Sequence, residues 1–284
     1  MGELETKQQR LEALLGKLTS VIVAYSGGVD SAYLAHAAHH VLGNRMLAVT
    51  ALSASYSARD RAEAEKCVAK FDFPHEFIET NELANPAYRA NQADRCYFCK
   101  DELFEKLGDL AKRRGFAAVA YGINKDDLGD WRPGQQAARE HKVLTPLLDA
   151  GMTKADIREL SRQVALPVWD RPASACLSSR IAYGIEVTPA RLAVVEKGED
   201  AVRALGFRQF RVRYHDQIVR IEISQEELPR ALDPAMAGKF VEIFKPLGFK
   251  FVTLDLEGFR SGSMNSVLVN IDKKINSRKS TPPE

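Results

Sequence analysis

A glycine-rich turn between two serines is the part of this sequence best suited to binding phosphate. The segment Ser26-Gly27-Gly28-Val29-Asp30-Ser31 follows the apolar run 21–25 and leads into the helical pattern 31–42. The first amides of a helix lack intrahelical acceptors and carry a partial positive charge, and glycines let the backbone approach oxyanions closely. The pattern therefore predicts an anion-binding turn that can accept the phosphates of ATP.

This turn is not a Walker loop, because the lysine that ends such a loop is missing and Asp30 stands in the turn. A carboxylate at that place could hold Mg²⁺ on the phosphates. The alternative is a tight strand-to-helix connection that binds nothing. We expect an ATP site in which Asp30 is both a catalytic residue and the Mg²⁺ ligand, formed by Ser26, Gly27, Gly28, Asp30 and Ser31.

Three of the four cysteines are candidates for sulfur or metal chemistry. Cys96 and Cys99 form a CxxC pair just before the helical pattern 100–114, and Cys176 lies in a segment of small and hydroxyl residues. Cys67 follows the apolar periodicity of a helix and is expected in the core. Three thiolates could hold a [4Fe-4S] cluster with one open iron. The alternative is a structural pair at 96 and 99, with Cys176 acting alone.

Further along the chain, arginines and acidic residues form two candidate ligand-binding groups. In the strand pattern 209–215, Arg211 and Arg213 lie on one face, opposite the apolar residues. Two neighbouring guanidiniums suit a phosphate or carboxylate, although a solvated strand face is the alternative. Asp126, Asp127 and Asp130 could bind Mg²⁺ or form turns.

The order of apolar runs indicates an α/β protein with a parallel sheet, followed by a smaller α+β domain. Five runs, 21–25, 46–52, 75–78, 117–123 and 143–147, alternate with helical patterns at 31–42, 58–71, 100–114 and 154–164. The second region contains helices 190–205 and 235–247 and strands 209–214, 218–223 and 250–256. We expect domains at 1–185 and 186–275 and a disordered tail at 276–284.

Composition restricts the class of protein. The chain has 284 residues, 45% of them hydrophobic, a formal net charge of +2 and four cysteines. This charge is too small to indicate nucleic-acid binding by bulk attraction. Without a long apolar stretch or a signal-peptide pattern, we expect a cytoplasmic protein that binds neither membrane nor nucleic acid.

Five motifs together carry a resemblance to a known family. The SGGVDS turn resembles the pyrophosphate loop (PP-loop) of the adenine-nucleotide alpha-hydrolase superfamily, which cleaves ATP to AMP and pyrophosphate. Over residues 10–270 the chain resembles the LarE family, through SGGVDS and the segments Asp130-Trp131-Arg132-Pro133-Gly134, Ala175-Cys176-Leu177-Ser178-Ser179-Arg180, Arg211-Val212-Arg213-Tyr214-His215 and Gly258-Phe259-Arg260-Ser261-Gly262.

The resemblance implies a PP-loop ATP pyrophosphatase fold and a sulfurtransferase. Its members adenylate pyridinium-3,5-biscarboxylic acid mononucleotide and convert the carboxylates to thiocarboxylates of the nickel-pincer nucleotide of lactate racemase. The implied phosphate-binding residues are Ser179, Arg180, Arg211 and Arg213, and a homo-oligomer is expected.

The family uses two sulfur sources. In one, three cysteines hold an iron–sulfur cluster that relays sulfide, which here implies Cys96, Cys99 and Cys176 as catalytic residues and iron ligands. In the other, one cysteine gives up its own sulfur, and that donor stands one place earlier, where this chain has Ala175. Other enzyme classes that use such a loop thiolate tRNA or form amides, as NAD synthetases do. A nucleotide sensor that holds ATP without turnover is a further alternative.

Overall fold

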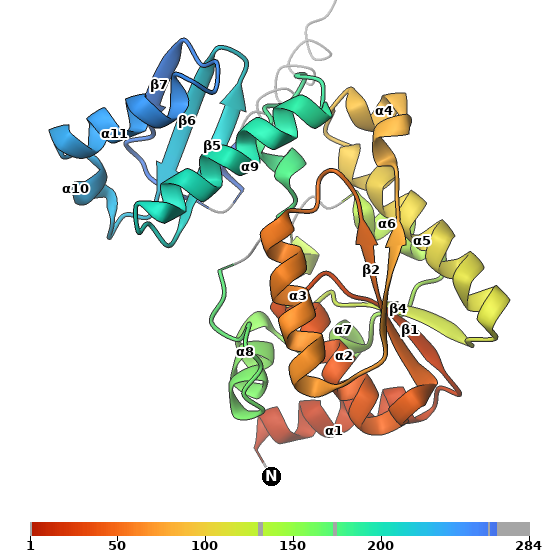
Figure 1. Ribbon diagram of the computed structural model, residues 1–284. Helices are drawn as coiled ribbons and strands as arrows, with labels where there is room; N and C mark the ends of the chain where they lie inside the picture. The colour runs from red at the N-terminus through yellow and green to blue at the C-terminus, as the bar shows by residue number, and fades with distance from the viewer. Residues whose placement is uncertain (1, 130–132, 173–174, 261, 266–284) are drawn as a thin grey trace, which may run out of the picture. The chain divides into compact units, whose positions relative to one another are not determined.

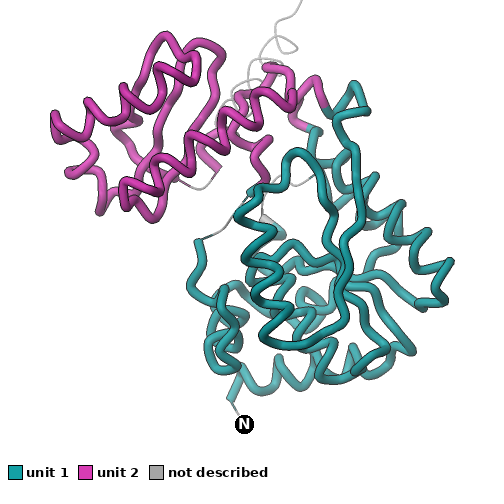
Figure 2. Tube along the Cα trace, in the orientation of Figure 1, with its two compact units in different colours: residues 1–88, 94–175 teal, residues 89–93, 176–284 magenta. Residues whose placement is uncertain are grey.

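The computed structural model describes residues 2–129, 133–172, 175–260 and 262–265. The chain divides into two compact units (Figure 2). Unit 1 comprises residues 1–88 and 94–175, and unit 2 comprises residues 89–93 and 176–284. The expected tail at 276–284 lies outside the described residues.

Residues 176–185 belong to unit 2, whereas the sequence placed the boundary at 185. The amide of Ala182 donates to the carbonyl of Tyr214 at 3.0 Å, and Ile181 forms a parallel bridge with Tyr214. The buried Asn91 joins the same unit, because its side-chain amide donates to the carbonyls of Ile181, Ala182 and Ile185 at 2.8–3.2 Å. Hydrogen bonds between distant segments therefore set this boundary.

Unit 1 alternates strands and helices, as predicted (Figure 1). Its strands are β1 (Val21–Ala24), β2 (Met46–Leu52), β3 (His75–Glu79) and β4 (Ala118–Tyr121). Its helices are α1 (Glu3–Gly16), α2 (Val29–Leu42), α3 (Ala58–Phe71), α4 (Pro86–Arg89), α5 (Arg95–Arg114), α6 (Gly134–Glu140), α7 (Pro146–Asp149) and α8 (Lys154–Gln163). None of the helices in the described residues is both long and apolar enough to cross a bilayer.

The four strands form one parallel sheet in the order β3-β2-β1-β4. Val21 of the central strand is in register with Met46 on one side and Ala118 on the other. All carboxyl ends therefore meet at one edge, where ligands of open α/β sheets bind. This arrangement confirms the predicted α/β class with a parallel sheet.

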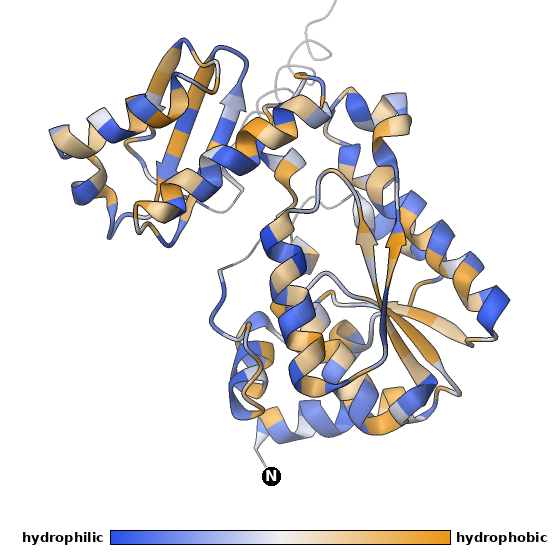
Figure 3. Ribbon diagram, in the orientation of Figure 1, coloured by the Kyte–Doolittle hydropathy of each residue, from blue (hydrophilic) through white to orange (hydrophobic). Residues whose placement is uncertain are grey.

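Both faces of this sheet are covered, because strand side chains alternate between two cores. Val21 and Val23 pack into a core with buried residues of α1, α2, α3, α7 and α8. Ile22 and Ala24 pack into a second core with residues of α5 and α6. Figure 3 shows the resulting pattern of apolar strands beneath helices with polar outer faces.

Two predicted elements of unit 1 differ from the structure. The run 143–147 is not a strand, because it contributes only a single parallel bridge between Leu144 and Ala120. Pro146 has no amide hydrogen to donate to a neighbouring strand, and it is the first residue of α7. Helix α5 begins at Arg95 rather than residue 100. Its added turn is stabilised by tertiary packing, because Tyr97 lies against the core that contains Phe104.

Unit 2 is the smaller α+β unit that the sequence predicted. It contains α9 (Pro189–Ala204), β5 (Phe210–His215), β6 (Ile218–Ile223), α10 (Leu228–Ala231), α11 (Pro234–Phe244) and β7 (Phe251–Leu254). The sheet order is β5-β6-β7, with β5 antiparallel and β7 parallel to β6. The tripeptide Leu-Gly-Phe occurs after both long helices of this unit, at 205–207 after α9 and at 247–249 after α11. Its glycines, Gly206 and Gly248, adopt φ of +87° and +97°.

The two faces of the small sheet are chemically different. Val212 and Ile221 belong to an apolar core that also contains Phe240 and Phe244 of α11. The opposite face carries charged residues, because alternation places Arg211, Arg213, Arg220 and Glu222 there. The predicted separation of apolar and arginine faces in β5 is therefore confirmed.

Candidate functional site

The predicted phosphate-binding turn lies at the carboxyl edge of the parallel sheet, between β1 and α2. The serines close the turn: the Ser26 amide donates to the Ser31 hydroxyl at 3.1 Å, and that hydroxyl donates to the Gly28 carbonyl at 3.0 Å. Gly28 is the N-cap of α2, so the first amides of this helix lie in the turn. The turn therefore has the hydrogen bonding and the helix start that the predicted anion-binding site needs.

Two glycines allow close packing around this turn. Gly27 has a φ of +73°, and a Cβ there would lie 2.8 Å from the Cβ of Ala64 on α3. Gly122, just after β4, has no such φ, but a Cβ there would lie 2.8 Å from the Ser31 amide nitrogen. Gly122 could not be identified from the sequence, because no local pattern indicates that the end of β4 packs against α2.

Asp30 is held by two residues that the sequence analysis did not identify. Its Oδ2 pairs with the ammonium of Lys154, and its Oδ1 accepts from the side-chain amide of Asn124 at 3.3 Å. The Asp30 side chain is largely buried. Asn124 follows β4 and Lys154 begins α8, and both positions lie at the carboxyl edge of the sheet. These positions are the one feature of the sequence that could have indicated the two residues as partners of Asp30.

Asp126 and Asp127, which follow β4, accept hydrogen bonds from backbone amides. The Asp127 carboxylate accepts from the Asn124 amide at 3.2 Å, and the Asp126 carboxylate accepts from the Lys154 amide at 2.8 Å. The Asp127 bond is local to the turn, whereas the Asp126 bond joins the loop to α8. Asp130 lies outside the described residues.

The oxygen donors at this edge suit Mg²⁺. Magnesium typically takes one or two protein carboxylates and completes its shell with phosphate oxygens and water. Asp30 provides such a carboxylate in the first turn of α2, beside the hydroxyl of Ser31. In the part of the chain that the structure describes, no group of three or more His, Cys, Asp or Glu side chains is arranged to hold a metal.

Cys96 and Cys99 lie inside the first turns of α5, not before the helix. Residues three apart are neighbours on a helix surface, so the two thiols share a face. Cys96 is exposed and Cys99 half-buried. The intervening Tyr97 donates its hydroxyl to Glu140 of α6 at 2.6 Å, and this hydrogen bond raises the pKa of Tyr97 to about 12.

The remaining cysteines have opposite environments. Cys67 is fully buried, which confirms its predicted place in the core. Cys176 is exposed and belongs to unit 2, directly before the 3₁₀ turn η4 (Leu177–Arg180). Its carbonyl accepts from the Ser179 hydroxyl at 2.8 Å and from Arg180 at 3.1 Å. The backbone at Cys176 is therefore tied to two of the predicted phosphate-binding residues.

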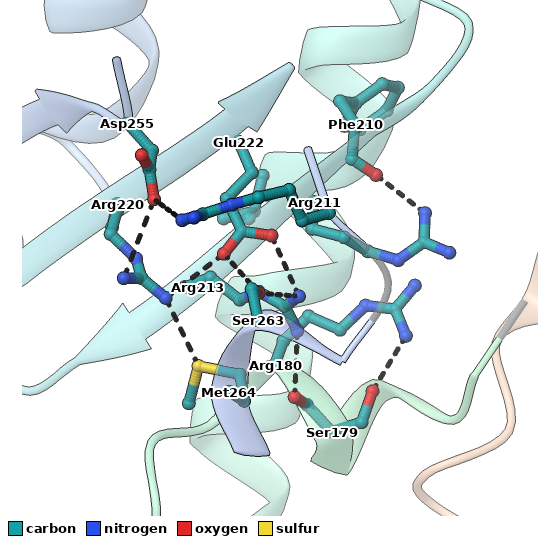
Figure 4. Close-up of polar contacts among 12 residues, drawn as sticks. Ser179, Arg180, Phe210, Arg211, Arg213, Arg220, Glu222, Asp255, Ser263 and Met264 are labelled. Carbon is teal, nitrogen blue, oxygen red and sulfur yellow. Dashed lines mark hydrogen bonds and ion pairs between the residues drawn. The ribbon is translucent and has the colours of Figure 1, made fainter. Parts of the chain in front are cut away.

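The four predicted phosphate-binding residues lie together in unit 2 (Figure 4). Arg180 donates to the Ser179 hydroxyl at 2.9 Å, and Arg213 donates to the Ser179 carbonyl at 3.1 Å. Arg211 donates to the carbonyl of Phe210, and its guanidinium lies over the ring of Phe259 at 5.0 Å. The pKa of Arg211 is lowered to about 10, mainly by burial and secondly by the positive charge of Arg180.

Buried carboxylates balance part of this positive charge. Glu199 pairs with Arg180 at 2.8 Å, and the fully buried Glu222 pairs with Arg213 at 2.8 Å and with Arg220 at 3.0 Å. No pattern in the sequence indicated either glutamate as a partner of these arginines. Among the described residues, nothing accepts a hydrogen bond from the buried Nε atoms of Arg213 and Arg220, so these two donors could serve an anionic ligand.

Comparisons with known proteins place the chain in a family. The chain is 43% identical over 265 residues to an uncharacterised protein from Synechocystis, covering 93% of this chain and 99% of that one. It is 35% identical to the pyridinium-3,5-bisthiocarboxylic acid mononucleotide synthase of Lactiplantibacillus plantarum, covering 94% and 97% of the two chains. An uncharacterised protein from Methanocaldococcus jannaschii is 27% identical, with 86% and 92% covered.

A scan against family models found no match. The full-length similarity to the synthase nevertheless shows the family, and it agrees with the motifs of the phosphate-binding turn and the arginine strand. This chain belongs to the LarE family, the family of the pyridinium-3,5-bisthiocarboxylic acid mononucleotide synthase.

Proposed function

We propose that this protein is an AMP-forming, ATP-dependent sulfurtransferase that converts the carboxylates of pyridinium-3,5-biscarboxylic acid mononucleotide to thiocarboxylates. The product would serve the nickel-pincer nucleotide of lactate racemase. The observation that carries this proposal is the 26–31 turn, with Asp30 held in it, in a chain 35% identical over almost its whole length to a synthase of that product class. The proposed location is the cytoplasm.

In the first step, a substrate carboxylate oxygen attacks the α-phosphorus of ATP. The bond from that phosphorus to the oxygen bridging to the β-phosphate breaks, and pyrophosphate leaves. The turn amides and the first turn of α2 would bind the phosphates, and Asp30 would hold Mg²⁺ on them. Positioning and electrostatic stabilisation supply most of the catalysis in such a step.

In the second step, a sulfur nucleophile attacks the carbonyl carbon of the acyl adenylate. The bond from that carbon to the phosphate-bound oxygen breaks, and AMP leaves with the former carboxylate oxygen. Arg211 and Arg213, with Ser179 and Arg180, would bind the substrate phosphate bidentately and so orient the ring. Among the described residues of this cluster, the guanidiniums of Arg180, Arg211, Arg213 and Arg220 outnumber the carboxylates of Glu199, Glu222 and Asp255, which supports this role.

Cys96, Cys99 and Cys176 would hold the [4Fe-4S] cluster. Cys96 and Cys176 are exposed and Cys99 is half-buried, so an added group could reach each thiol. A cluster with an open iron would supply a bound sulfide as the nucleophile. The second version of this chemistry has Cys176 donate its own sulfur.

The test is mass spectrometry of the nucleotide products after anaerobic incubation of iron-reconstituted protein with ATP, Mg²⁺, sulfide and the biscarboxylate mononucleotide. We expect thiocarboxylate, AMP and pyrophosphate over many turnovers, and loss of the thiocarboxylate in Cys176→Ala but not in Cys67→Ala. One turnover per chain would favour a sacrificed cysteine. Unchanged substrate would overturn the proposed function.

A further inference from the structure

The phosphate-binding turn has no basic residue of its own, yet a lysine reaches it from elsewhere in the chain. Residues 26–31 contain no lysine or arginine. The ammonium of Lys154, 124 residues after Asp30, pairs with the Asp30 carboxylate in the first turn of α2. Tertiary structure thus brings a cation to the place where phosphate would bind.

The backbone at Lys154 is fixed, so the side chain starts from a defined point. Lys154 is the first residue of α8, and Thr153 caps this helix through a reciprocal pair of hydrogen bonds with Asp156. The Lys154 amide donates to Asp126 at 2.8 Å, and the Lys125 amide donates to the carbonyl of Met152 at 2.8 Å. The start of α8 is therefore joined to the loop after β4.

The Lys154 side chain keeps the freedom that a ligand-binding lysine needs. It is 32% exposed, whereas the Asp30 side chain is 18% exposed. An ammonium has three donors on a flexible four-carbon stem, so it can keep one bond to Asp30 and offer others to a phosphate. Asn124 also holds Asp30, so the carboxylate does not depend on the lysine alone.

The charge balance at the turn requires such a cation. Asp30 places a negative charge beside the amides that would receive a polyphosphate, and two like charges in a partly buried site repel each other strongly. A Mg²⁺ ion held by Asp30 would offset part of this repulsion. We propose that Lys154 binds the pyrophosphate portion of ATP and stabilises the charge that develops on pyrophosphate as it leaves; this inference rests on the proposed function.

The other explanation is that Lys154 only neutralises Asp30. A double-mutant cycle separates the two roles. Calorimetry would measure binding of Mg²⁺-pyrophosphate and, separately, of AMP to the wild type, Lys154→Met, Asp30→Asn and the double variant. Lys125→Met is the matched control, because it removes an exposed lysine next to the same loop.

We expect Lys154→Met to weaken pyrophosphate binding at least tenfold, to change AMP affinity less than twofold, and to weaken pyrophosphate binding equally in the Asp30→Asn background. Lys125→Met should match the wild type. Lys154→Arg, which keeps the charge, should restore most of the affinity. Lys154→Gln, which also removes the charge, replaces the methionine variant if that variant does not fold. A Lys154 effect that disappears in the Asp30→Asn background would overturn the inference, as would no effect at all.

Failure of the inference differs from failure of the proposed function. Wild-type protein that forms thiocarboxylate while Lys154→Met binds pyrophosphate normally refutes only the role of Lys154. Wild-type protein that shows the lysine-dependent pyrophosphate binding but forms no thiocarboxylate refutes only the proposed reaction.

Discussion

Replacing Gly122 by alanine should weaken the proposed ATP binding by displacing the backbone of Asp30 and Ser31, although it replaces no residue of the 26–31 turn itself. The new Cβ would lie 2.8 Å from the Ser31 nitrogen and 2.9 Å from the Asp30 carbonyl carbon, where ordinary contacts begin near 3.4 Å. Both atoms are backbone, so the first turn of α2 must retreat by about half an ångström. Overpacking of this kind costs about 1–3 kcal/mol. If this free energy is lost from ATP binding, the affinity for ATP falls about 5- to 150-fold.

Calorimetric titration with ATP and Mg²⁺, combined with thermal unfolding, would measure this effect. The matched control is Gly108→Ala on α5, because no atom lies within 4 Å of a Cβ there. Alanine should stabilise that helix by about 0.5–1 kcal/mol and leave ATP affinity unchanged. An alanine at position 122 that leaves both ATP affinity and the unfolding temperature at wild-type values would refute the packing argument.

Three further predictions concern stability and the roles of buried groups. Burial lowers the pKa of His75 to about 4, from an ordinary value of 6.5. As the pH falls between these values, His75 binds a proton in the unfolded chain but not in the folded one. The free energy of unfolding should therefore drop by about 2 kcal/mol between pH 7.5 and pH 5. Denaturant titrations at both pH values would show this drop in the wild type and a smaller one in His75→Gln. Glu222→Ala should cost about 3–5 kcal/mol, because it leaves the buried Arg213 without its carboxylate partner. Glu257→Ala, at an exposed pair, should cost under about 1 kcal/mol. Equal free-energy costs in urea unfolding would contradict the buried charge network. Cys67→Ala should lower thermal stability but keep sulfur incorporation, because Cys67 is buried in the core. Cys96→Ala should keep thermal stability but lose sulfur incorporation, because Cys96 is exposed. Thermal unfolding and product mass would measure both, and sulfur incorporation that persists in Cys96→Ala would argue against Cys96 as a cluster ligand.

Local patterns in the sequence predicted most secondary structure and several site residues. The glycines and serines of the 26–31 turn, the alternation that separates Val212 from Arg213, and the helical periodicity that buries Cys67 all depend on neighbouring residues. Backbone preferences and burial periodicity operate over a few residues, so a single sequence displays them. The same reasoning failed at Pro146, where one missing amide hydrogen ended a run that looked like a strand.

Tertiary structure alone decided which distant residues meet. Lys154 reaches Asp30 because both lie at the carboxyl edge of the sheet, and Gly122 presses on α2 because β4 pairs with β1. Glu222 lies beside Arg213 because the antiparallel register of β5 and β6 places them on one face. Strand order and register follow from the packing of the whole chain. The sequence by itself therefore determined the types of chemical groups and their local geometry, and the fold determined their partners.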